Sequence, residues 1–309
     1  MSTILITGGT GLIGSALTPM LTGKGHKVVI LTRNEKAADV NGVSYATWDV
    51  KSQKINENAV SSADYIIHLA GAAVADKRWT SDRKKEITES RTQSGALLVK
   101  ALQQVPNKVK AVVSASAIGW YGKDENRSPK KKSFTEDMRP DKEFLGETCR
   151  KWEESIEPVK EAGKRLVKLR IGIVLSNDGG ALPEFKKPIR FGIAGVLGSG
   201  KQVISWIHIE DLCRMFVYAI ENESMEGVYN AVAPAPVRNK ELALLLAKKM
   251  KGRFFVHMHV PSFVLKTMLG EMSVEVLKSA TVSAEKIRLA GFSFLFPSIE
   301  TALENLING

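Results

Sequence analysis

The sequence predicts an α/β fold built on a doubly wound parallel sheet, with a smaller, discontinuous α+β domain toward the C-terminal side. The apolar stretch at residues 4–6 leads directly into a glycine-rich turn at residues 7–14, which opens an amphipathic helix. Strand-like and helix-like segments then alternate through the first half of the chain, as in parallel sheets with crossover helices. Glycines cluster between residues 172 and 200, and helical patterns dominate after residue 237. A strand, a glycine turn and a helix in this order are typical of the Rossmann fold.

The alternation assigns the elements in chain order. After the first strand and helix we expect strands at residues 27–31, 43–48, 64–70, 110–116 and 166–174. The two longest helical patterns between them cover residues 80–104 and 143–162. We expect a short strand at 204–209, and helices at 239–250, 262–269, 283–290 and from Pro297 onward, with Ser283 as the N-cap and Gly291 as the C′ residue of the third.

This order of elements divides the chain into two expected domains. Residues 1–175 form the dinucleotide-binding Rossmann domain, to which residues 203–233 return. Residues 176–202 and 234–309 form the substrate-binding C-terminal domain. Ligands of open α/β sheets bind beyond the carboxyl ends of the strands, so we expect the C-terminal domain to lie over that edge.

Composition is that of a soluble globular protein. Of the 309 residues, 44% are hydrophobic and 25% are charged. No run of eighteen apolar residues occurs, so we expect no transmembrane helix and no membrane partner. The N-terminus leads directly into a strand, which leaves no room for a signal peptide. The two cysteines, Cys149 and Cys213, indicate reduced thiols and a cytoplasmic location.

The chain carries a formal net charge of +11 and has a pI near 9.5. Its densest basic runs, at residues 130–132 and 248–251, lie in a mixed-charge loop and at the end of a helical pattern. Neither run has the aromatic or recognition-helix context of a nucleic-acid site. We interpret both as solvated surface and expect no nucleic-acid partner, while the excess positive charge would attract a polyanionic cofactor.

The glycine turn has the spacing that binds a dinucleotide. Gly9, Gly11 and Gly14 satisfy the G-x-G-x-x-G pattern, and Gly8 begins a related G-x-x-G-x-x-G pattern. Glycine permits the tight turn, lets backbone N–H groups approach the pyrophosphate and lets helix and strand pack closely. An ordinary glycine turn is the alternative, but the flanking strand and helix supply the required context. We expect cofactor contacts from Gly8, Gly9, Thr10, Gly11, Leu12, Ile13 and Gly14.

The end of the second strand favours NADP(H) over NAD. NAD-binding proteins carry an acid there, which binds the ribose 2′-OH. This chain has Thr32 and Arg33 instead, and the nearest acid, Glu35, lies beyond the strand. Arg33 would pair with a 2′-phosphate, and Thr32 would add a hydroxyl donor. We also expect Asp49 near the adenine, and the small residues Leu69, Ala70 and Gly71 against the ribose and pyrophosphate.

Motifs for other chemistries are incomplete. Residues 195–201 have P-loop spacing, but Gln202 replaces the magnesium-binding Ser/Thr and a strand follows in place of a helix. His257 and His259 share one face of a strand without a third ligand nearby, so we expect no metal site. His208 and Asp211 are interpreted as a structural pair.

Segments along nearly the whole chain resemble extended short-chain dehydrogenases/reductases, and within that group the YfcH-type, NAD(P)-dependent epimerase/dehydratase-like family. The resemblance rests on residues 7–14, 69–71, 77–79, 89–91, 114–119, 170–175, 205–211 and 229–234, and on a tail at 260–271 that is similar to that family's C-terminal domain. It implies a cytoplasmic, NADP(H)-binding oxidoreductase or epimerase-like protein. It also implies cofactor contacts from Thr32, Arg33, Leu69, Ala70, Glu86, Arg91 and Val174.

Catalysis in this superfamily uses Ser or Thr, Tyr and Lys. By the same resemblance, Ser116 at the carboxyl end of the 110–116 strand stands where a serine orients the substrate oxygen. The Tyr-x-x-x-Lys pair is absent, because no tyrosine in this chain has a lysine four residues later. The helix expected to carry the pair begins with Phe144 and Leu145, whose side chains cannot transfer a proton.

Two hypotheses for the function follow. The first is an NADP-dependent oxidoreductase or epimerase acting on a small hydroxyl or carbonyl substrate, with nucleotide sugars as one candidate class. Tyr121 would then be the substitute acid, and residues 123–142 would close over the site as a lid. The second is a non-catalytic, NADPH-responsive binding or regulatory protein. Cofactor oxidation in a substrate screen would separate them, and a homodimer is a further expectation.

Overall fold

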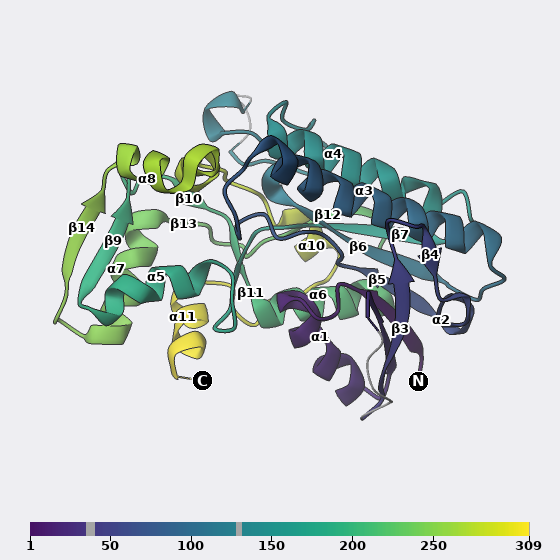
Figure 1. Ribbon diagram of the computed structural model, residues 1–309. Coiled ribbons are helices and arrows are strands. Elements are labelled where there is room, and N and C mark those ends of the chain that lie inside the picture. Colours follow the sequence, from purple (N-terminus) through teal and green to yellow (C-terminus); the bar gives the residue numbers. More distant parts are fainter. Residues whose placement is uncertain (35–40, 128–131, 309) are drawn as a thin grey trace.

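The computed structural model describes residues 1–34, 41–127 and 132–308 (Figure 1). An eight-stranded sheet with the order β12-β7-β6-β5-β1-β2-β3-β4 forms its larger part. Neighbouring strands are parallel, except that β4 is antiparallel to β3 at one edge. The strands are β1 Thr3–Thr7, β2 Lys27–Thr32, β3 Val43–Asp49, β4 Lys54–Ile55, β5 Tyr65–His68, β6 Ala111–Ala117, β7 Arg165–Ile171 and β12 Gly227–Ala231.

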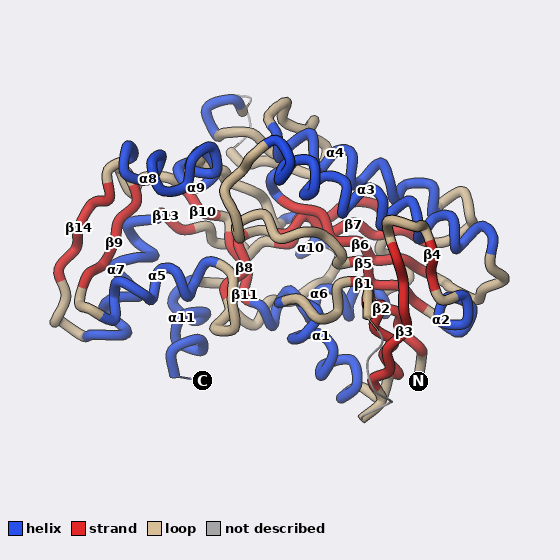
Figure 2. Tube along the Cα trace, viewed as in Figure 1, coloured by secondary structure: helices blue, strands red, loops and turns tan. Residues whose placement is uncertain are grey.

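Helices cover both faces of the sheet, because apolar side chains alternate between the faces along each strand (Figures 1 and 2). On β1, Ile4 and Ile6 share one core cluster with Leu17 of α1, whereas Leu5 belongs to a second cluster with Leu97 of α3. Helix α6 packs beside α1, and α4 beside α3. This doubly wound arrangement confirms the predicted fold class. The helices are α1 Leu12–Gly23, α2 Glu57–Ser62, α3 Ser81–Gln104, α4 Phe144–Ile156 and α6 Ile209–Glu221.

Most of the chain after β7, apart from α6 and β12, builds a second part at the other end of the molecule (Figure 2). Strands β9 and β14 pair in parallel there, β8 pairs in parallel with β11, and β10 pairs antiparallel with β13. A third core cluster joins Leu182, Leu246 and Leu303 from three different helices. These elements are β8 Ile173–Leu175, α5 Ala181–Arg190, β9 Ile193–Leu197, β10 Val203–Ile204, β11 Trp206–His208, β13 Val237–Arg238, α7 Asn239–Lys251, β14 Val256–Val260 and α11 Ile299–Asn308.

Several expected elements are divided in the structure. The 166–174 segment forms β7 and then β8, because the chain leaves the large sheet at Gly172, where a Cβ would lie 2.6 Å from the carbonyl oxygen of Ser205. The 143–162 helix ends at Ile156 and continues only as a 3-10 turn, Glu157–Val159, which contains Pro158. Helix α10, Glu285–Leu289, begins after the expected N-cap, although Ser283 Oγ still accepts from the Glu285 N–H at 3.1 Å.

Strands β4, β9, β12 and β13 were not among the predicted strands, whereas β14 is the strand expected to carry His257 and His259. The remaining short elements are α8 Ser262–Leu269, α9 Ser273–Leu277 and the 3-10 turns Ile118–Trp120, Asp124–Asn126 and Gly270–Met272. Within the described residues, no helix combines the length and the apolar character that a bilayer span requires.

Candidate functional site

The turn between β1 and α1 is held in place by two glycines that leave no room for a side chain. Gly8 has a φ of +68°, and a Cβ on it would lie 2.8 Å from the carbonyl carbon of Leu69 at the end of β5. A Cβ on Gly14 would overlap the backbone of Gly9. These positions therefore let β1, α1 and the end of β5 approach one another closely.

Gly11 differs from both, because its Cβ position is nearly open. Within 4 Å that Cβ would meet only the carbonyl oxygen of Gly8, at 3.3 Å. Gly11 is the N-cap of α1 and supplies no side-chain acceptor to the first-turn N–H groups. Thr10 and Gly11 are also exposed. A helix N-terminus of this kind can bind an anion, which fits the pyrophosphate of a dinucleotide.

A buried histidine orders the end of β5 next to this turn. Thr7 Oγ1 accepts from the N–H groups of Leu69 and Ala70 at 3.1 Å each and lies 2.7 Å from His68 Nδ1. Since Thr7 Oγ1 already accepts two hydrogen bonds, we assign its hydrogen to Nδ1. Burial lowers the pKa of His68 to about 3, so the imidazole is neutral. This network positions Leu69 and Ala70 beside Gly8.

Arg91 of α3 places a buried cation at the same edge. Its Nη1 donates to the carbonyl oxygens of Ala72 at 3.0 Å and Ile87 at 2.8 Å, and its guanidinium lies 4.9 Å from the centre of the Trp152 ring. Burial lowers the pKa of Arg91 to about 10. A Cβ on Gly71 would lie 3.0 Å from the Arg91 Cζ, so Gly71 and Arg91 are neighbours. Arg91 thus adds positive charge to this edge of the sheet.

Two other expected contact residues have their polar groups engaged in the protein. The exposed Glu86 pairs with Arg83 at 2.6 Å, and this hydrogen bond lowers the pKa of Glu86. Asp49 accepts from Ser52 Oγ at 2.6 Å and from the Lys51 N–H at 2.9 Å, and the Ser52 hydrogen bond lowers its pKa. Asp49 therefore orders its own turn at the end of β3.

The end of β2 presents one ordered and one exposed side chain. The Thr32 hydroxyl donates to the carbonyl oxygen of Asn34 at 2.5 Å, which turns the chain away from the sheet. Arg33 is exposed, and β2 pairs directly with β1. Glu35 lies outside the described residues. Val174, on β8, lies near the start of α1, with Gly180 between them. A Cβ on Gly180 would lie 3.1 Å from the Val174 oxygen and 3.4 Å from Leu12 Cδ2.

The expected catalytic serine is held by a residue that the sequence had not singled out. Ser116, at the end of β6, is buried, and its Oγ donates to Glu153 Oε1 at 2.7 Å. Glu153 forms a two-pronged ion pair with Arg170 of β7, with Nε–Oε1 and Nη2–Oε2 distances of 2.8 and 3.1 Å. The Arg170 guanidinium also stacks 3.6 Å from the centre of the Trp120 ring.

Tyr121, which was expected as the substitute acid, lies inside the protein. Its side chain is fully buried and stacks on Phe134 with ring centres 5.1 Å apart. The hydroxyl donates to Asn230 Oδ1 at 2.7 Å and accepts from Arg170 Nη1 at 3.1 Å. Burial raises the pKa of Tyr121 to about 12. A hydroxyl with both partners inside the protein does not reach a substrate, so this geometry argues against direct proton transfer from Tyr121.

The sequence contained a signal for the missed residues of this network. Strand β7 carries Lys168 and Arg170 among apolar neighbours, and a buried strand tolerates charges only when they are paired. Glu153 lies on the buried side of α4, within pairing distance of both cations. Asn230 of β12 lacked such a signal, because its partner Tyr121 is 109 residues away.

An aromatic contact occupies the start of α4, where the missing tyrosine was expected. Phe144 packs against Trp79 with ring centres 4.9 Å apart. It also lines a surface groove of about 580 Å³ between α3 and α4, together with Lys84, Lys85, Thr88, Glu89, Thr92, Lys151 and Glu154. No residue of the glycine turn lines this groove.

The segment proposed as a lid is anchored where it is described. Residues 128–131, which include two lysines of the 130–132 run, lie outside the described residues. Asp124 accepts from the Ser279 and Thr281 hydroxyls at 2.9 and 2.7 Å, and the Phe134 N–H donates to the Thr281 oxygen at 2.7 Å. Both described sides of the segment are therefore tied to residues 279–283.

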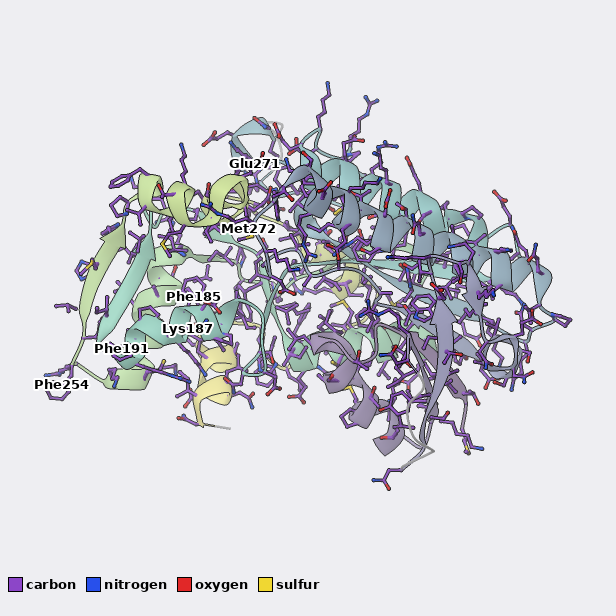
Figure 3. The ribbon with its side chains drawn as sticks, viewed as in Figure 1. Phe185, Lys187, Phe191, Phe254, Glu271 and Met272 are labelled. Atoms are coloured by element: carbon purple, nitrogen blue, oxygen red, sulfur yellow. The ribbon has the colours of Figure 1, made fainter. Side chains whose placement is uncertain are left out.

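The C-terminal segment also binds the loop that follows β5. Arg78 donates from Nε to the Met268 oxygen at 3.2 Å and from Nη2 to the Thr267 oxygen, both at the C-terminal end of α8. Lys84, in the first turns of α3, pairs with Glu271, which follows α8 (Figure 3). The loop after β5 and the start of α3 are thus joined to the C-terminal segment by two cationic side chains.

Comparison with known protein families shows which family this chain resembles. The model of the NAD dependent epimerase/dehydratase family matches residues 4–231. The chain belongs to this family. Residues 260–306 match a domain of unknown function, DUF1731, which confirms that the C-terminal tail is a family feature in its own right.

Relatives match this family chain over its full length. An epimerase family protein of Staphylococcus saprophyticus is 38% identical over 309 residues, covering 100% of both chains. The epimerase family protein YfhF of Bacillus subtilis is 35% identical and covers 98% of this chain and 97% of its own. These relatives confirm the predicted resemblance.

A solved structure of similar size also matches. The human epimerase family protein SDR39U1, crystallised with NADPH, superposes with a TM-score of 0.87 at 29% identity and 99% coverage of both chains. A Corynebacterium glutamicum protein described as a nucleoside-diphosphate sugar epimerase superposes at 0.77 and 29% identity, covering 99% of this chain and 58% of its own. The extended short-chain dehydrogenase/reductase fold is therefore confirmed.

Proposed function

We propose that this protein binds NADP(H) at the β1–α1 turn and acts as an oxidoreductase or epimerase on a small hydroxyl or carbonyl compound. The observation that carries the proposal is the open Cβ position of Gly11 at the uncapped N-terminus of α1. An anion can approach the helix there without displacing a side chain. The NADPH of the human neighbour supports the same class of cofactor.

The preference for NADP(H) rests on the end of β2. Arg33 is exposed there, and Thr32 and Arg33 stand where an NAD-binding protein would carry an acid. A guanidinium can form charge-assisted hydrogen bonds to a 2′-phosphate, which NADH lacks. We also propose a cytoplasmic location, because Cys149 and Cys213 are both free thiols.

The chemistry that the cofactor would supply is hydride transfer at its nicotinamide ring. Among this chain's own residues, Ser116 is the candidate that orients the substrate oxygen. Because its hydrogen is donated to Glu153, Ser116 offers an acceptor oxygen and suits a substrate hydroxyl better than a carbonyl. Ser116 is therefore a positioning group in this proposal, and the Tyr-Lys pair has no counterpart at the start of α4.

A second candidate is an NADPH-responsive binding protein without turnover. It is favoured by the burial of both hydroxyls, since Ser116 and Tyr121 are 2% and 0% exposed. In that case cofactor binding would alter the Arg78 and Lys84 contacts to the C-terminal segment.

A screen for cofactor turnover tests the proposed function. The purified protein is mixed with NADPH and carbonyl compounds, or with NADP⁺ and hydroxyl compounds including nucleotide sugars, and absorbance of the reduced nicotinamide is followed. An oxidoreductase gives turnover that the Gly11→Val variant lacks. An epimerase is detected by product analysis, because it returns the cofactor unchanged. NADPH binding without turnover or product across all substrates would favour the second candidate.

A further inference from the structure

The positive charge of this protein is concentrated in two segments. Residues 185–209 and 242–270 contain nine Lys or Arg residues and no Asp or Glu. They therefore account for +9 of the formal net charge of +11, although they make up only 54 of the 309 residues. The remainder of the chain is close to neutral.

Folding brings these two segments together at one end of the molecule. Strand β9 comes from the first and β14 from the second, and the two pair in parallel from Ile193–Val256 to Leu197–Val260. The turns before them are adjacent, because the Val256 N–H donates to the Gly192 oxygen at 2.9 Å. Phe191 and Phe254, one on each turn, lie at the extremity of this end (Figure 3).

Apolar side chains are exposed on the same end. Phe191, Phe254 and Phe263 are 85, 87 and 70% exposed, and Val256, Met258 and Met268 are 67, 55 and 66% exposed. These six are half of the large apolar side chains that are exposed in the described parts of the chain, and the other six are scattered. Clustered exposed apolar side chains mark a docking surface, whereas single ones do not.

Cations neighbour these apolar side chains in the sequence. Arg190 precedes Phe191, Arg253 precedes Phe254, and Lys266 lies between Phe263 and Met268 on α8. All three are exposed, and none pairs with a carboxylate among the described residues. We call Phe191, Phe254, Phe263, Arg190, Arg253 and Lys266 the basic aromatic end.

The sequence offers no reason to expect a membrane partner, but from these exposed side chains we propose that the basic aromatic end docks on the surface of a bilayer that contains anionic phospholipids. Exposed phenylalanines at turn tips can enter the boundary between headgroups and acyl chains, and the adjacent cations attract anionic headgroups. The protein would bind the surface of the bilayer and not cross it, since neither β14 nor the eight-residue α8 spans a bilayer.

The other occupants fit less well. A single-stranded nucleic acid would use the cations and stack bases on the rings, but the aliphatic Val256, Met258 and Met268 give it no stacking surface. A second copy of the chain would bring two ends with an excess of positive charge together. Charge and apolar exposure together therefore favour the anionic bilayer.

Cosedimentation of the full chain with vesicles tests the proposal. We expect binding to vesicles of phosphatidylcholine mixed with phosphatidylglycerol, weaker binding at high salt, and no binding to phosphatidylcholine alone. The Phe191→Ser and Phe254→Ser double variant should reduce vesicle binding by about a hundred-fold, because each buried Phe is worth roughly a ten-fold gain in partitioning. Arg253→Glu with Lys266→Glu should reduce it by a similar factor.

Matched variants elsewhere control for the change in side chain. Leu289→Ser removes a side chain on α10 that is 80% exposed, and Lys100→Glu reverses an exposed charge on α3. Both should bind vesicles as the unmodified protein does, and all variants should keep their melting temperature. The proposal is overturned by absence of phosphatidylglycerol-dependent binding, or by full binding in the double phenylalanine variant. Competition with poly(U) RNA tests the nucleic-acid alternative. The proposal is also overturned if poly(U) RNA does not compete with vesicles for the protein and if the charge reversals weaken the binding of RNA but not that of vesicles.

Discussion

At the turn between β1 and α1 the polar groups of the backbone face outward, whereas at the end of β6, two strands away, the polar side chains face one another. Gly11 leaves its helix N-terminus open, while Ser116, Glu153, Arg170 and Tyr121 form a closed buried network. Both regions lie at carboxyl ends of strands in one sheet. Position at this edge is therefore not enough to identify a reactive group, because its hydrogen-bonding capacity can already be used within the fold.

The largest expected effect lies in the closed network. Glu153→Gln removes the carboxylate that pairs with Arg170 and Ser116, and it leaves a buried guanidinium without its counter-charge. Breaking a buried pair in this way typically costs about 3–5 kcal/mol of stability. Urea unfolding of both proteins measures the loss. Glu154→Gln is the matched control, because its exposed carboxylate pairs with Arg150 and an exposed pair contributes only about 0–1 kcal/mol.

If Glu153→Gln unfolds at nearly the same urea concentration as Glu154→Gln, the buried network around Glu153 does not stabilise the fold. The contrast between the open β1–α1 turn and the closed network at the end of β6 then fails. Retained stability together with lost turnover would instead assign Glu153 to chemistry.

At the open region the expected effect is on binding and not on folding. Gly11→Val should weaken NADPH binding by about a hundred-fold or more, because a branched side chain would occupy the space in front of the α1 N–H groups. Circular dichroism and melting temperature should stay near those of the unmodified protein. Gly14→Val, by contrast, should destabilise the fold, because its Cβ overlaps the Gly9 backbone. Full NADPH affinity in Gly11→Val would mean that the turn is only structural.

The buried histidine beneath the open region predicts a dependence of stability on pH. His68 has a folded pKa near 3, well below its ordinary value of 6.5, so the unfolded chain binds a proton that the folded chain does not. Its contribution is fully present above pH 6.5 and is lost progressively as the pH falls toward 3. Linkage gives a loss of about 2 kcal/mol at pH 5.

His68→Asn is the variant that isolates this contribution, because its amide oxygen can still accept from Thr7 Oγ1. The difference in unfolding free energy between pH 7 and pH 5 should be smaller in His68→Asn than in the unmodified protein. Equal pH dependence of the two proteins would show that the imidazole is not held neutral.

The smallest of these effects concerns Tyr121. Tyr121→Phe leaves Asn230 and Arg170 each without one buried partner, which we expect to cost about 1–3 kcal/mol in urea unfolding. NADPH affinity should be unchanged, and any turnover should stay within a few-fold. A fall in turnover of a hundred-fold at unchanged stability would restore Tyr121 as the proton donor.

The fold and the open region could be predicted from the sequence because they depend on local pattern. The glycine spacing at residues 8–14 specifies a backbone shape, and the alternation of strands and helices specifies the doubly wound sheet. Strand β14 was expected only as the strand of His257 and His259, because four of its five residues are exposed and burial imposes no clear pattern on it.

The closed region could not be predicted, because its hydrogen bonds join residues far apart in the chain. Tyr121 and Asn230 are 109 residues apart, and Ser116 and Glu153 are 37 apart. Whether a hydroxyl is free or satisfied depends on partners that only the folded chain brings together. Motif spacing placed Ser116 at the end of its strand but said nothing of its burial.

The relative affinity for NADPH and NADH tests the central claim most directly, namely that the open edge binds a cofactor with a 2′-phosphate. Both are titrated by nicotinamide fluorescence into the unmodified protein and into Arg33→Asp. A charge-assisted contact worth about 1.5–3 kcal/mol predicts NADPH binding roughly ten- to hundred-fold tighter than NADH. In Arg33→Asp this preference should shrink or reverse while NADH affinity is kept. Equal affinities for the two cofactors in the unmodified protein would contradict the account.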